Sequence, residues 1–270
     1  MPRSRVALVM AFAAVYTIWG STYLAIHYAI ATIPPFIMAG GRFLIAGALM
    51  YLWTAWRGVK PATRIQWRNA SAIGVLLLTV GNGGVAWAER VVPTGIAALI
   101  VAIVPLWLVA LEWARRGGTR PSRGVALGVA VGLVGMWVLV GPGPSSGSAP
   151  INVRGALVLV FASVSWAAGS LIARYADLPS PLLATGIEML VGGAALMILG
   201  FGSGEMSSFA PRAVSTSSLE GLAYLIVFGS LIAFTAYSWL LKNATPAAVG
   251  TYAYVNPVVA VFLGWLIAGE

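Results

Sequence analysis

The chain has 270 residues, of which 60% are hydrophobic and 9% charged, and its mean hydropathy is +0.91. A soluble domain carries roughly 25% charged residues, so this composition excludes an ordinary water-soluble fold and makes lipid the solvent of most side chains. The net charge of +9 comes from basic residues in short loops rather than from a basic domain, which argues against nucleic-acid binding.

Apolar runs of about 20 residues, the length that crosses a bilayer, recur along the chain. Turn-forming or charged residues separate them, and proline stands at or near the start of several. We predict an all-α, multi-pass membrane protein with nine spans, near residues 6–29, 34–56, 69–88, 93–113, 124–140, 154–175, 180–201, 219–241 and 246–268.

The Lys and Arg residues are distributed unequally between the two sides of these spans. With the N-terminus inside, the basic loops 57–68 and 114–123 are cytoplasmic, whereas Arg90, Arg154 and Arg212 fall outside. Basic residues are enriched in cytoplasmic loops, so this bias predicts a cytoplasmic N-terminus in a bacterial-type inner membrane.

Residues 141–153 include a stretch rich in Gly, Pro and Ser and form the best candidate for a linker. They divide the chain into a first half, residues 1–140, and a second half, residues 154–270. Similar residues recur in the two halves: Trp19, Tyr28, Pro35, Gly40 and Gly47 correspond to Trp166, Tyr175, Pro181, Gly186 and Gly193.

Five predicted spans precede the linker, and this odd number makes equivalent helices of the two halves cross the membrane in opposite directions. The pattern therefore predicts an inverted repeat of two five-helix halves. In secondary transporters with such repeats, the substrate site lies near the midplane, and rocking of the halves gives alternating access.

Four strings resemble the EamA branch of the drug/metabolite transporter superfamily: Trp19-Gly-Ser-Thr-Tyr23, Pro35-Phe-Ile-Met-Ala-Gly-Gly-Arg-Phe43, Val92-Pro-Thr-Gly-Ile-Ala-Ala98 and Tyr252-Ala-Tyr-Val-Asn-Pro257. The resemblance implies a fold of ten helices and export of amino acids or related metabolites. Such a fold continues after Gly269-Glu270 into a tenth helix, so we expect the natural chain to contain one.

Polar and aromatic residues at mid-depth in the spans are the candidates for a substrate site, because buried amides and tyrosine hydroxyls need partners that lipid does not offer. Packing or hydrogen bonding between helices is the alternative role. The candidates are Trp19, Tyr23, Asn82, Trp166, Tyr237, Tyr252 and Asn256.

Arg42 and Glu188 are charged residues within apolar spans, and they occupy equivalent positions in the two halves. Intramembrane charges are costly and seldom face lipid. These two side chains could hold the carboxylate and amine of a zwitterion, or they could form an ion pair or hydrogen-bonded anchor between helices.

These features predict a secondary exporter of small metabolites, most favourably amino acids of broad specificity, including aromatic and hydrophobic ones. Other small drugs or metabolites are alternative substrates, and a channel or an intramembrane enzyme is a weaker alternative. The chain has no cysteine, one histidine and no recognisable catalytic cluster, so we expect no enzyme, cofactor or metal. Gly124, Gly128 and Gly132 form a small-residue face that could serve a homodimer.

Overall fold

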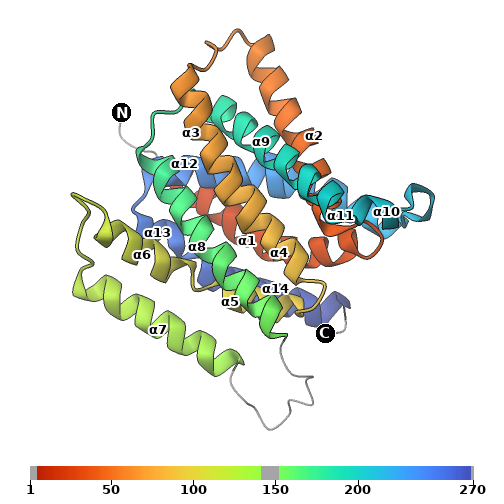
Figure 1. Cartoon of the computed structure of the whole chain (residues 1–270). Helices are drawn as coiled ribbons and strands as arrows, with labels where there is room; N and C mark the ends of the chain where they lie inside the picture. The colour runs from red at the N-terminus through yellow and green to blue at the C-terminus, as the bar shows by residue number, and fades with distance from the viewer. Residues whose placement is uncertain (1–4, 141–151, 269–270) are drawn as a thin grey trace.

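The computed structural model describes residues 5–140 and 152–268, and the regular elements in these ranges are all helical (Figure 1). Eight helical spans are long and apolar enough to cross a membrane, and a shorter apolar helix lies at the edge of the bundle. The predicted all-α class is confirmed.

The first half contains five predicted spans. Four of them are long helices or consecutive helical segments, and the fifth, α7, lies at the periphery. Two are continuous: α1 (Arg5–Ile30) and α2 (Pro35–Trp56). The others are α3 (Arg64–Gly74) with η1 (Val75–Asn82) and α4 (Gly83–Ala88), α5 (Thr94–Val101) with α6 (Val104–Ala114), and α7 (Arg123–Val140).

The second half follows the same order. Its continuous helices are α8 (Val153–Tyr175) and α9 (Pro181–Gly202), followed by the short α10 (Glu205–Ser208) and η2 (Pro211–Ala213). The remaining elements are α11 (Thr216–Tyr224), η3 (Leu225–Phe234) and α12 (Thr235–Asn243), then α13 (Pro246–Gly250), α14 (Tyr252–Leu263) and η4 (Gly264–Ala268).

Local chemistry accounts for the helix starts. Pro35, Pro181 and Pro246 each occupy a first helical turn, where a missing amide donor costs nothing. The predicted start of the third span at residue 69 is wrong: α3 begins at Arg64 because Thr63 and Gln66 form a capping box, in which each side chain accepts the other's backbone N–H.

Helices α2 and α9 lie side by side and make extensive contact (Figure 1). A Cβ built on Gly40 would lie 3.1 Å from the carbonyl oxygen of Gly193, and one built on Gly47 would lie 2.9 Å from that of Gly186. Because Gly40 and Gly47 correspond to Gly186 and Gly193 in the repeat, the two contacts are related by the symmetry of an antiparallel, inverted pair.

Two kinds of helix irregularity recur in equivalent spans and were not predicted. The third span of each half contains a π-helical segment, η1 or η3, and the fourth span of each half is interrupted, between α5 and α6 or at Thr251. Broken or widened helices free backbone groups and often mark functional sites in transporters.

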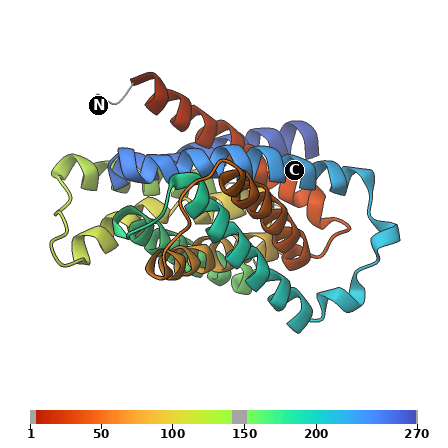
Figure 2. The same ribbon diagram turned by 90° about the horizontal axis from the view of Figure 1, so that it is seen from above.

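Helix α7 and the first turns of α1 lie at the periphery; the N-terminal turns of α1 project from the bundle in Figure 2. A Cβ on Gly132 would lie 2.5 Å from the Tyr254 ring, so this glycine packs within the chain, whereas Gly128 faces open space. The homodimer stays a prediction. Most of the predicted linker, residues 141–151, lies outside the described residues, and Asn152 caps α8.

Candidate functional site

The central cavity, about 640 Å³ with its open side included, lies between both halves of the chain. Its walls come from α1, α2, η1, α8, η3 and α14, with smaller contributions from α4 and α5. Six of the seven predicted site residues line it, together with one of the two predicted charges: Trp19, Tyr23, Asn82, Trp166, Tyr252, Asn256 and Arg42.

Tyr237, the seventh candidate, lies behind the wall and does not line the cavity. It is fully buried, its hydroxyl accepts a hydrogen bond from Trp166 Nε1 at 3.0 Å, and it lies 2.6 Å from the Ser170 hydroxyl. The structure therefore places Tyr237 as a support that orients Trp166.

Trp19 is the centre of an aromatic cluster at one end of the cavity. Its ring centroid lies 4.8 Å from that of Tyr237, 5.3 Å from that of Tyr252 and 5.4 Å from that of Trp166. Trp19 Nε1 donates to the carbonyl oxygen of Gly229 in η3 at 3.2 Å. These contacts hold the indole in one orientation, so the cavity has a rigid aromatic wall.

The polar atoms of the cavity are few, and three of them are buried without a hydrogen-bond partner in the part of the chain that the structure describes: Arg42 Nη1, Asn82 Oδ1 and Asn256 Oδ1. Arg42 is held in place because its Nε donates to the Ser230 hydroxyl at 2.7 Å. Leaving a buried polar group unpaired costs about 1–3 kcal/mol, so one unused donor and two unused acceptors in one cavity indicate a polar ligand.

Arg42 and Glu188 do not form a pair. Arg42 lines the central cavity, whereas Glu188 lines a second cavity together with Lys242. The two residues have equivalent sequence positions, but inverted helices turn them toward different neighbours. A zwitterion bridging Arg42 and Glu188 is therefore not supported, and neither is a direct ion pair between them.

Sequence reasoning missed several lining residues, among them Phe43, Ser163 and Phe234. None has an unusual position along its span, so no sequence signal marks it. The Ser163 hydroxyl accepts a hydrogen bond from Trp107 Nε1 at 3.1 Å.

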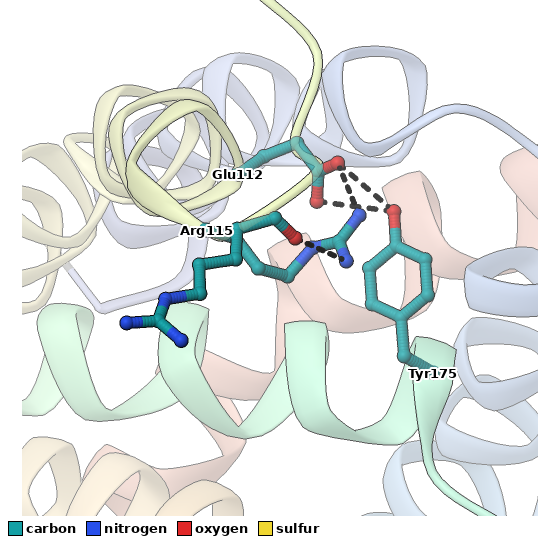
Figure 3. A network of polar contacts seen from close by, with 4 residues as sticks. Glu112, Arg115 and Tyr175 are labelled. Carbon is teal, nitrogen blue, oxygen red and sulfur yellow. Dashed lines mark hydrogen bonds and ion pairs between the residues drawn. The ribbon is translucent and has the colours of Figure 1, made fainter.

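A polar cluster joins α6 to the end of α8 beyond the aromatic cluster (Figure 3). The Tyr175 hydroxyl lies 3.0 and 3.1 Å from the two carboxylate oxygens of Glu112, to which it donates, and Arg115 Nη2 donates to the same carboxylate at 3.1 Å. The Arg115 guanidinium also lies 4.0 Å from the centre of the Tyr175 ring. We call Glu112, Arg115 and Tyr175 the latch.

Among the described residues, no group of His, Asp and Glu side chains is placed to hold a metal ion. Of the described residues that line the cavity, Arg42 is the charged one, and the others are aromatic, aliphatic or neutral polar. Such an arrangement suits recognition of a small molecule with an apolar body and an anionic group.

The sequence pattern of the EamA-like transporter family matches residues 6–141 and 153–270. The chain is 43% identical over 269 residues to the uncharacterized inner membrane transporter YedA of Escherichia coli (strain K12), covering 99% of this chain and 85% of that protein. It is 25% identical to protein PecM of Dickeya dadantii (strain 3937), covering 92% of this chain and 80% of PecM.

A solved crystal structure shares the fold, with a TM-score of 0.74 at 24% sequence identity. The similarity covers 98% of this chain and 89% of the other.

Proposed function

Because the chain belongs to the EamA-like transporter family, we propose that it is a secondary transporter that exports amino acids, including aromatic and hydrophobic ones, from the cytoplasm. YedA is an inner membrane transporter, and eight helical spans in the described part of this chain are long and apolar enough to cross a membrane. Membership of this family supports a transport function, and the chemistry of the central cavity supports amino acids as the substrate class.

The substrate class is inferred from the polar atoms of Arg42, Asn82 and Asn256 that have no hydrogen-bond partner within the described residues. A guanidinium binds carboxylate well, because its N–H groups match the carboxylate oxygens. Amide carbonyl oxygens accept hydrogen bonds from an ammonium group. An amino acid therefore satisfies all three positions at once, and its side chain meets the aromatic wall formed by Trp19, Trp166 and Tyr252.

Alternating access requires that one end of the cavity close while the other opens. The aromatic cluster and the latch lie toward the ends of α6 and α8 that the basic-residue bias assigns to the cytoplasm. We propose that they close the cytoplasmic end in this conformation. Rocking of the two halves about the α2 and α9 glycine contacts would break the latch and admit substrate from inside.

Counterflow in proteoliposomes tests the proposal. Vesicles preloaded with an unlabelled amino acid should transiently accumulate the same labelled amino acid, and the initial rate should saturate with concentration. Accumulation with phenylalanine or leucine, but not with a sugar, supports the substrate class. Folded protein that shows no counterflow with any amino acid would refute it, and a non-saturating flux would indicate a channel.

A further inference from the structure

A second cavity, about 520 Å³ with its open side included, lies between α8, α9 and α12 and is separate from the central one. Glu188 lies within it and is 3% exposed. Its rim includes the exposed Lys242 and the neighbouring Asn243, at the end of α12. The cavity thus connects a deeply buried carboxyl group to the end of the molecule assigned to the cytoplasm.

The polar neighbours of Glu188 are engaged elsewhere. The Thr185 hydroxyl donates to the Ser238 hydroxyl at 3.4 Å, and Asn243 Nδ2 donates to the carbonyl oxygen of Trp239 at 2.8 Å. Lys242 Nζ donates to the backbone oxygen of Arg174 at 2.9 Å. Within the described part of the chain, no donor is hydrogen-bonded to the Glu188 carboxyl group.

An ionised carboxylate in an apolar region, with no donor, is costly, whereas a neutral carboxyl group is far less so. The carboxylate becomes tolerable when water enters the cavity or the Lys242 ammonium approaches. We propose that Glu188 is a proton-binding site of the transport cycle. It takes up a proton on one carboxylate oxygen while accessible from outside and releases it to the cytoplasm through the second cavity. This proposal rests on the proposed export function.

Few charged side chains surround the Glu188 site. Lys242 on α12 is the charged side chain that shares the cavity with Glu188, and Arg174 and Asp177 at the end of α8 lie near Lys242. Helix α2, helix α3 and η1 bring no charged side chain into the cavity, and Arg42 of α2 faces the central one. One carboxyl group, opposed by one ammonium group, therefore dominates its electrostatics.

The helix contacts offer a direct connection between proton and substrate. Glu188 lies on α9 between Gly186 and Gly193, and Arg42 lies on α2 between Gly40 and Gly47, at the backbone contacts that join the two helices. A charge change at Glu188 that shifts α9 is transmitted to the α2 backbone, because at both contacts a glycine faces a backbone carbonyl oxygen of the other helix.

Dicyclohexylcarbodiimide provides a test that needs no substrate, because it adds to protonated carboxyl groups in apolar surroundings and leaves a stable acylurea. Peptide mass spectrometry of the purified protein should find the adduct on Glu188, decreasing as the pH is raised, and not on the exposed Glu220 of α11. Lys242→Gln should move the midpoint of this decrease to higher pH, because removing a nearby ammonium destabilises the carboxylate. A Glu188 that is unmodified, or modified equally at all pH values, would overturn the proposal.

Transport gives the second test. With one proton exchanged per substrate, a gradient of one pH unit supports about a tenfold accumulation. Glu188→Gln should lose this accumulation yet retain counterflow, which needs no proton movement. If proton-driven accumulation persists in Glu188→Gln, the proton site is wrong although export stands. If the parent protein shows pH-dependent modification but no amino-acid flux, the substrate proposal fails while the site stands.

If Glu188→Gln does not fold, Glu188→Asp keeps the test available. It retains a carboxyl group on a shorter side chain, and we expect it to keep proton-driven accumulation at a reduced rate. Accumulation that is wholly independent of the pH gradient in the parent protein would also overturn the proposal.

Discussion

Gly47 on α2 and Gly186 on α9 meet backbone to backbone: a Cβ on Gly47 would lie 2.9 Å from the Gly186 carbonyl oxygen and 2.8 Å from the Leu190 nitrogen. Both neighbours are backbone atoms, so neither can rotate away. This contact and its symmetric counterpart at Gly40 and Gly193 bring the backbones of the two halves into direct contact.

Gly47→Ala should destabilise the protein by about 1–3 kcal/mol, because the added methyl group forces the two helices apart. Gly41→Ala on the same helix is the matched control, since nothing lies within 4 Å of a Cβ built there. Thermal unfolding of the detergent-purified variants measures the difference. Equal melting temperatures for the two variants would contradict the tight packing of α2 on α9.

Asn256→Ala and Tyr252→Ala should each lower the apparent affinity for substrate about ten- to hundredfold, the effect of losing about 1–3 kcal/mol of binding energy. Because Asn256 Oδ1 has no hydrogen-bond partner within the described protein, alanine there should leave folding nearly unchanged. Counterflow at sub-saturating substrate measures the loss. Trp113→Ala, at a side chain that is 55% exposed, is the control and should transport normally.

Arg42→Lys should weaken the binding of amino acids about tenfold or more, because an ammonium group does not reproduce the paired N–H groups of a guanidinium. The matching amine without a carboxylate should be affected much less. Competition of each compound against labelled substrate compares the two. An equal loss for both compounds would show that Arg42 does not bind the carboxylate.

Tyr175→Phe should weaken the closed cytoplasmic end, since it removes the hydroxyl that donates to Glu112. Hydrogen bonds to charged groups contribute about 1.5–3 kcal/mol, enough to raise the population of the open conformation by about tenfold. A cysteine in place of Ser170, behind the aromatic cluster, should then react faster with a thiol reagent from the cytoplasmic side. Tyr51→Phe is the control, and an unchanged reaction rate in Tyr175→Phe would argue against the latch.

The orientation of the chain can be tested with single cysteines, because these 270 residues contain none. Ser207→Cys, in the exposed α10 region, should react with an impermeant thiol reagent on intact cells, whereas Thr119→Cys should react only after permeabilisation. The reverse pattern would place the N-terminus outside.

The sequence by itself determined the solvent of the fold, the order of the spans and the correspondence between halves, because each depends on hydrophobicity and position along the chain. It also selected by depth the residues that surround the central cavity. The depth of a residue in the membrane follows from its position along its span, because each helical residue rises about 1.5 Å. For that reason Trp19, Asn82 and Asn256 could be chosen before any contact was known.

The tertiary structure alone decided which way each side chain points. Arg42 and Glu188 share depth and repeat position, yet they face different cavities, and Tyr237 lies behind the wall that Tyr252 forms. The π-helical segments and breaks rotate the residues that follow them, and helix rotation depends on packing with distant segments. Hydrophobicity along one chain contains no such information when the helices are apolar on nearly every side.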